Sequence, residues 1–145
     1  MADIRQKFTN AQSVTITLAS LGNAATALSN AIDNSANKFV SMLLQLKIKT
    51  GSSGAGATGY IKVYLVTSAD GGTTYDDSNA NAILLGTFSL TANSTTYIFS
   101  MDTGALGITL PDYFKILVDN ETGTTLDGTA GNHSAKFLGK IFETA

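Results

Sequence analysis

The fold is decided by residues 60–75, which read YIKVYLVT followed by SADGGTTY. In the first half, Ile61, Val63 and Leu65 alternate with tyrosine and lysine, so the apolar side chains all point to one side of an extended backbone. β-Branched and aromatic residues suit such a pleated, half-buried surface. The pattern therefore predicts a β-strand over residues 60–67 that buries one face in the core.

Residues 68–75 end this strand in a turn, because their adjacent glycines accept positive φ and allow a returning strand to begin. Their spacing, Ser-x-Asp-x-Gly-x-Thr-aromatic, resembles the Asp-box hairpin of sialidase propellers. There the carboxylate, here Asp70, accepts hydrogen bonds from turn amides, and the aromatic residue, here Tyr75, covers the turn. A propeller needs several copies at a regular period, and only one is present, so we interpret the box as a turn element without glycosidase activity.

A calcium site is a second interpretation of the same loop, with Asp70, Asp76 and Asp77 as ligands. The loop lacks both the alternate-position oxygen spacing of an EF-hand and a glutamate at its end. Solvated turn carboxylates are therefore the favoured interpretation.

Other segments show the same alternation. Residues 38–49 carry an apolar residue at every second position from Val40 to Ile48. A slip of one residue would expose this whole set, so the pattern fixes the pairing register and predicts a central strand. Further strands are predicted at residues 13–18, 83–90, 95–101, 113–119 and 134–142, with a short strand or edge at 124–126.

The intervening segments are predicted as loops. Residues 19–37 mix alanines with Asn, Asp and Gly turn formers, which favours a loop with a short strand or a helical turn. Residues 50–59 hold no apolar side chain larger than alanine and are expected to be a flexible surface connection. They lack the Gly-Lys-Ser/Thr ending of a phosphate-binding loop, so a nucleotide site is excluded.

Together these segments predict an all-β fold, an antiparallel two-sheet β-sandwich that is jelly-roll-like and has about seven or eight strands. A single domain is expected over residues 13–145. Residues 1–12 are interpreted as an N-terminal arm or lead-in, which is either a frayed terminus with anchoring side chains or a segment that docks on a neighbouring subunit.

The alternation also predicts which side chains face the core. In the strand 83–90, Leu84, Phe88 and Leu90 are expected to point inward. In the last strand, Lys136 and Lys140 are expected to point outward and to blunt an exposed sheet edge.

Composition excludes several classes of function. The chain of 145 residues has no cysteine, so it can form neither a disulfide nor a thiolate metal site. Its net charge of −2 argues against a nucleic-acid footprint, which needs a clustered basic face. No stretch approaches the roughly 18 apolar residues of a membrane helix, and the N-terminus does not resemble a secretory signal. We expect a protein that folds in the cytoplasm of the cell that makes it.

The residues also argue against an enzyme. His133 is the only histidine, and its neighbour Ser134 would point to the opposite face of a strand, which disfavours a catalytic pair. A loop histidine bonded to backbone is the better interpretation. Asp119, Glu121 and Asp127 come closest to a carboxylate cluster, but nothing in the sequence brings them together. No catalytic residue, metal ligand or cofactor is predicted.

A family resemblance enters at residues 110–127 and 131–137, and residues 64–72 and 84–88 add to it. These segments span most of the chain after Lys38 and resemble small virion structural proteins of tailed bacteriophages. The resemblance implies a capsid cement, or decoration, protein: a small β-sandwich that clamps neighbouring major capsid proteins from outside, in many copies per particle or as a homo-oligomer. It further implies location in the virion, binding by interface burial without chemistry, and neither nucleic acid nor membrane as partner.

Under this interpretation the partner contacts would come from the arm, the glycine-rich loop and outward aromatic side chains, which are enriched at interfaces. The alternative for each tyrosine is that it packs against its own cross-strand neighbours. The predicted interface residues are Ile4, Phe8, Tyr60, Tyr64 and Tyr113.

A different function remains open beside the cement protein. The alternative is a module associated with the phage tail, baseplate or fibre that binds a surface glycan, because outward tyrosines could stack on sugar rings. A hydrolase, as a third class, would need a nucleophile–base pair, which the sequence does not offer.

Overall fold

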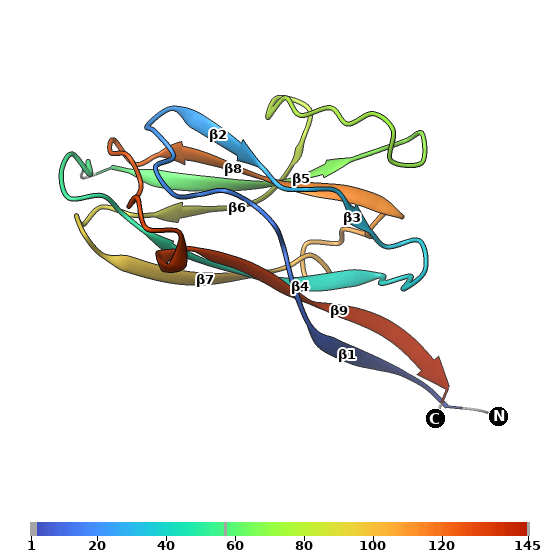
Figure 1. Cartoon of the computed structure of the whole chain (residues 1–145). Helices are drawn as coiled ribbons and strands as arrows, with labels where there is room; N and C mark the ends of the chain where they lie inside the picture. The colour runs from blue at the N-terminus through green and yellow to red at the C-terminus, as the bar shows by residue number, and fades with distance from the viewer. Residues whose placement is uncertain (1–2, 57, 145) are drawn as a thin grey trace.

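The computed structural model describes residues 3–56 and 58–144 and shows two antiparallel sheets packed face to face (Figure 1). Sheet A has the order β1-β9-β4-β7, and sheet B has the order β2-β8-β5-β6, with the short β3 also on β8. The strands are β1 (Ile4–Ser13), β2 (Ala25–Leu28), β3 (Ile32–Asp33), β4 (Ser41–Lys49), β5 (Tyr60–Thr67), β6 (Ile83–Ser89), β7 (Thr96–Asp102), β8 (Tyr113–Glu121) and β9 (Ser134–Thr144), with a short 3₁₀ turn at Ala130–Asn132.

The strand pairs are nested: β5 pairs with β6, β4 with β7, β2 and β3 with β8, and β1 with β9. The chain is thus one long antiparallel hairpin wound into two sheets, which is the arrangement of a jelly roll. The predicted antiparallel β-sandwich is confirmed.

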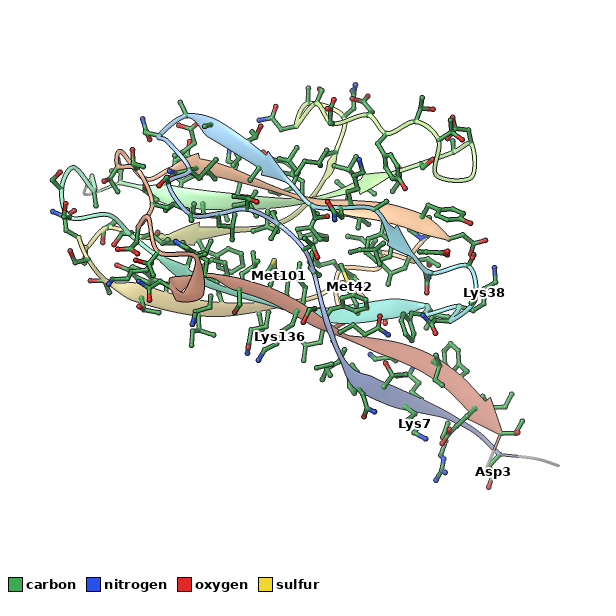
Figure 2. The ribbon with its side chains drawn as sticks, in the orientation of Figure 1. Asp3, Lys7, Lys38, Met42, Met101 and Lys136 are labelled. Atoms are coloured by element: carbon green, nitrogen blue, oxygen red, sulfur yellow. The ribbon has the colours of Figure 1, made fainter. Side chains whose placement is uncertain are left out.

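The core lies between the two sheets, where the predicted inward positions are buried. On β4, Met42, Leu44, Leu46 and Ile48 are fully inaccessible to solvent. The inward residues of β8, such as Phe114, are equally buried and complete the opposite wall. Figure 2 shows Met42 and Met101 in this space between the layers. The period-two pattern therefore predicted the buried faces of β4 and β8 correctly.

Residues 13–18 do not form the predicted strand beyond Ser13. Val14 and Leu18 are buried as expected, and the Val14 amide donates to the Ala135 carbonyl at 2.9 Å. After that contact, however, the chain leaves β9 and crosses from sheet A to β2 in sheet B. The alternation in residues 13–18 arises because every second side chain packs against the core. Such packing gives the sequence pattern of a strand even where no neighbouring strand is hydrogen-bonded.

The prediction that Leu84 faces the core is wrong. Leu84 is exposed, whereas Leu85 is buried, together with Leu90 further along. The cause is a β-bulge, because the pairing register with β5 shifts between Val63, opposite Gly86, and Tyr64, opposite Leu84. An extra residue on one strand reverses the alternation beyond it.

The edge role predicted for Lys136 and Lys140 is also wrong. Both lysines lie on β9, which is an inner strand between β1 and β4, and the edges of sheet A are β1 and β7. The lead-in segment occupies the edge instead, because residues 4–13 form β1 and pair with the last strand of the chain.

The glycine-rich connection 50–59 is held against the neighbouring turn at 122–125 in its described part. The Gly56 amide donates to the Thr122 carbonyl at 2.8 Å. A Cβ on Gly51 would lie 2.2 Å from the Thr125 carbonyl oxygen, so glycine permits this close approach. The expected surface location holds, but the segment is fixed by backbone contacts rather than being a free connection.

Candidate functional site

The end of the β1–β9 pair extends beyond the sandwich as a two-stranded ribbon, with the Ile4–Thr144 pair at its tip (Figure 1). We define the ribbon as residues 4–8 of β1 and 140–144 of β9. Three of its large apolar side chains are exposed to solvent: Ile4 by 72%, Phe8 by 45% and Phe142 by 55%. Isolated exposed apolar residues are common, but a group on a protruding element is typical of an interaction site.

The pairing register places these apolar side chains on one face of the ribbon. Ile4 pairs with Thr144, and the next pairs on the same face join Gln6 to Phe142 and Phe8 to Lys140. Directly opposite residues of an antiparallel pair share a face, and alternate pairs share the same one. Ile4, Phe8 and Phe142 therefore form one apolar surface.

The other face of the ribbon carries charges that satisfy one another. Arg5 lies opposite Glu143 and donates from Nε to Oε1 at 2.9 Å, while the Lys7 ammonium lies 3.3 Å from Oε2 of the same carboxylate. The ribbon is thus amphipathic, with an ion-paired face and an apolar face.

The apolar face of the ribbon continues onto the outer face of sheet A. At the junction, β1 has a bulge between Phe8 and Ala11, and beyond it Ala11 lies opposite Leu138. A hollow of about 280 Å³ opens there, lined in part by Ala11, Leu43, Leu138 and Lys136. Figure 2 shows the Lys136 side chain directed away from the sandwich on this side. The ribbon and the outer face of sheet A form one continuous surface.

The predicted tyrosines lie elsewhere, on the outer face of sheet B. Tyr64 is only 8% exposed, because it packs with Val66, Leu117 and Tyr75 beneath the loop 68–82. This loop is the segment that runs above sheet B in Figure 1. The alternative in which a tyrosine packs within its own chain thus describes Tyr64.

The other two tyrosines are half-buried. Tyr113 lies against the same loop, since a Cβ on Gly72 would be 2.9 Å from its ring. Tyr60 has the Lys62 ammonium 5.2 Å from its ring centroid. The structure therefore brings Ile4 and Phe8 together but leaves the tyrosines on the opposite side of the sandwich.

Sequence reasoning missed Phe142, Leu138 and Leu43 as members of the surface. The signal was present in the last strand, where apolar residues occur at outward as well as inward positions. An outward Leu138 and Phe142 on the same strand as an inward Phe137 indicate a second apolar face.

The Asp box is confirmed as a turn element. The Asp70 carboxylate accepts hydrogen bonds from the Thr73 and Thr74 amides at 3.1 and 2.9 Å, and also from the Thr74 hydroxyl. The Ser68 hydroxyl donates to it at 2.8 Å. These bonds, first that of the Thr74 hydroxyl, hold the pKa of Asp70 well below its usual range. Its aromatic residue covers sheet B rather than the turn, and the returning strand begins only at Ile83.

His133 is bonded to backbone, as predicted. The Lys49 amide donates to its Nδ1 at 3.4 Å, so Nε2 carries the proton and donates to the Asp127 carbonyl at 2.8 Å. Among the described residues, no group of three or more His, Cys, Asp or Glu side chains could hold a metal ion. Asp119 instead accepts from the Asn79 amide group at 3.1 Å.

Neither protein-family models nor curated proteins yield a match to the chain. In the part of the chain that the structure describes, no helix has the length and apolar character needed to cross a membrane.

Proposed function

We propose that the protein is a non-enzymatic structural component of a tailed-bacteriophage particle, a capsid cement protein that binds the major capsid protein shell from outside. The resemblance of residues 64–72, 84–88, 110–127 and 131–137 to small phage virion proteins supports the class of protein. The observation that carries the proposed role is the projecting ribbon with Ile4, Phe8 and Phe142 exposed on one face.

The ribbon gives a physical mechanism for such a role. It reaches beyond the body of the sandwich, so one molecule can seat its body on one capsid subunit and its ribbon on the next. Burying a large apolar side chain contributes about 1.5–3 kcal/mol before the entropic cost of association is subtracted. A few such side chains in each of many copies would stabilise a shell against internal pressure.

The test is binding to emptied capsid shells from the same source, stripped of this protein. The test variant is Phe8→Ser/Phe142→Ser, and the matched control is Ile83→Ser/Leu84→Ser, whose residues are similarly exposed and lie on β6 at an edge of sheet B, away from the ribbon. We expect the ribbon variant to lose binding and the control to keep it. Cryo-electron microscopy of the intact particle should show the sandwich repeated on the outer capsid, at junctions between capsomers.

One result would contradict the cement role, and another would contradict the part that the ribbon plays in it. Density for this fold at the tail alone would support the tail, baseplate or fibre module, and binding of an isolated glycan would favour that module further. Equal binding of the ribbon variant and the control to shells would remove the ribbon from the interface.

A further inference from the structure

Four lysines gather on the outer face of sheet A, although the protein as a whole is acidic. The outward positions of its inner strands carry Lys47 and Lys49 on β4 and Lys136 and Lys140 on β9, as the burial of the alternate residues shows. The chain has a net charge of −2, so this face is opposite in sign to the whole molecule.

The lysines differ in how far their charges are engaged by the protein itself. The Lys49 ammonium lies 3.8 Å from the Asp127 carboxylate, and Lys47 donates to the Gly131 carbonyl at 3.0 Å. Asp102, the acidic residue at an outward position of β7, accepts hydrogen bonds from the Gly104 and Ala105 amides of its own turn. The charges left to act on a partner are those of β9.

On β9 the outward side chains alternate between cation and apolar group. They follow the order Lys136, Leu138, Lys140 and Phe142, and residues two apart on a strand are spaced by roughly 6.6–6.8 Å. Lys140 lies with its ammonium 5.0 Å from the Phe8 ring centroid, so its cation sits beside an exposed apolar side chain. A partner that covers Leu138 and Phe142 must place its own groups beside both lysines.

A hollow lies beside each of these lysines. Lys136 lines the hollow of about 280 Å³, together with Leu43 and Leu138. Lys140 lines a second hollow of about 330 Å³, together with Phe142 and Ile108. Both hollows have apolar side chains and a lysine in their lining, and the second also has polar side chains such as Ser41 and Thr109. Each volume can admit a side chain.

We propose that this surface binds a protein segment that presents apolar side chains next to carboxylates. The apolar side chains would enter the hollows, and the carboxylates would pair with Lys136 and Lys140 at their rims. The apolar walls favour a protein over a nucleic acid, whose backbone offers charge without side chains to fill the hollows. The inference rests on the proposed function, since it specifies the chemistry of the capsid surface that the protein would contact.

The experiment uses the full chain and two double variants with matched changes. Lys136→Gln/Lys140→Gln removes charge from sheet A, and Lys62→Gln/Lys115→Gln removes the same charge from sheet B. The sheet A pair includes one lysine that lies over an aromatic ring, Lys140 over Phe8, whereas both lysines of the sheet B pair do so, Lys62 over Tyr60 and Lys115 over Tyr75. The control thus loses at least as many cation–π contacts as the test variant, so weaker binding by the test variant alone does not follow from that loss.

The first measurement is selection of a random dodecapeptide display library on the wild-type protein. We expect enriched peptides that combine Leu, Phe or Ile with Asp or Glu, that bind about tenfold more weakly to the sheet A variant than to the sheet B variant, and that weaken with added salt. The backbone amide signals of Leu43 and Leu138 should shift on binding. The proposal is overturned if no peptide is enriched, if enriched peptides carry no acidic preference, or if both variants bind equally.

The second measurement separates this inference from the proposed function. Wild-type protein and both variants are mixed with stripped capsid shells, with anionic lipid vesicles and with duplex DNA. If the peptides behave as expected but shells bind no wild-type protein, the proposed function fails and the surface stands. If shells bind both variants equally, the inference fails and the cement role stands. Lysine-dependent binding to vesicles or DNA, without binding to peptides, would overturn the proposal that the partner is a protein.

Discussion

The two outer faces of the sandwich have the same alternating sequence pattern, but the chain covers one face and leaves the other partly exposed. On sheet B, Tyr64, Val66 and Leu117 are covered by the loop 68–82 of the same chain. On sheet A, the corresponding outward apolar residues Leu43 and Leu138 remain partly open to solvent beside a hollow. The outer face of sheet B is thus packed against a segment of the same chain, whereas this part of the outer face of sheet A is not.

The difference shows that outward apolar residues become a binding surface only when no connection of the chain returns over them. The loop 68–82 is held over sheet B by specific contacts, such as Asn79 to Asp119 at 3.1 Å and the Lys115 ammonium 4.3 Å from the Tyr75 ring centroid. The connections at the ends of sheet A turn within short distances, for example at residues 103–107. We therefore place the interaction surface on sheet A.

The largest expected effect on stability comes from the same leucine-to-alanine substitution made on each of the two outer faces. Leu117 is 1% exposed, whereas Leu43 is partly exposed. Leu117→Ala should lower the free energy of unfolding by about 2–4 kcal/mol, because a packed side chain is lost and a cavity remains. Leu43→Ala should cost less than about 1 kcal/mol. Urea unfolding followed by circular dichroism measures both, and equal losses would mean that the two faces are equally packed.

A second pair of variants compares a packed turn with an open one. Gly72 and Gly107 have φ of 90° and 73°, so alanine at either position costs about 1–2 kcal/mol of backbone strain. A Cβ at Gly72 would also press on the Tyr113 ring, whereas nothing lies within 4 Å of one at Gly107. We expect Gly72→Ala to cost about 1 kcal/mol more than Gly107→Ala in thermal unfolding. The reverse order would show that the loop 68–82 is not packed against Tyr113.

Acid should loosen the covering loop of sheet B. The pKa of Asp70 is lower in the folded protein than its ordinary value of 3.8, so its carboxylate stabilises the turn above that pH. This stabilisation falls as the pH drops through the lowered folded value. The Thr73 and Thr74 amide signals, followed by NMR from about pH 5 to pH 1.5, should stay unchanged through the ordinary aspartate value and begin to shift only at the acid end of this range. Asp70→Asn should abolish this shift, and a midpoint at the ordinary aspartate value would contradict the bonded geometry.

The smallest expected effect on stability belongs to the ribbon. Phe142 is 55% exposed, so Phe142→Ser should change the free energy of unfolding by no more than about 0.5 kcal/mol. The expected change is small because little of the protein packs around this side chain. Chemical denaturation measures the free energy of unfolding of both proteins. A loss as large as that of Leu117→Ala would show that Phe142 is part of the core and unavailable to a partner.

Much of the fold followed from local pattern. The strand at residues 60–67, the inward face of β4 and the Asp70 turn were predicted because period-two burial and turn chemistry are written in adjacent residues. The inward placement of Leu84 failed because a bulge in the β5–β6 pairing reverses the alternation, and a bulge depends on the partner strand.

The candidate surface was only partly predictable. Ile4 and Phe8 stood out as large apolar groups in a polar lead-in, and the structure places them together on the ribbon. Phe142 could not be joined to them from the sequence, because pairing between the two ends of a chain carries no local signal.

The sequence by itself determined that the chain forms short strands with defined apolar faces, because side-chain alternation and turn residues act over a few neighbours. Only the tertiary structure decided which outward face is covered and which strands form the edges. Those outcomes depend on the path of the loop 68–82 and on the pairing of β1 with β9. Both are set by contacts between residues far apart in the chain, and these contacts leave Tyr64 buried and Phe142 exposed.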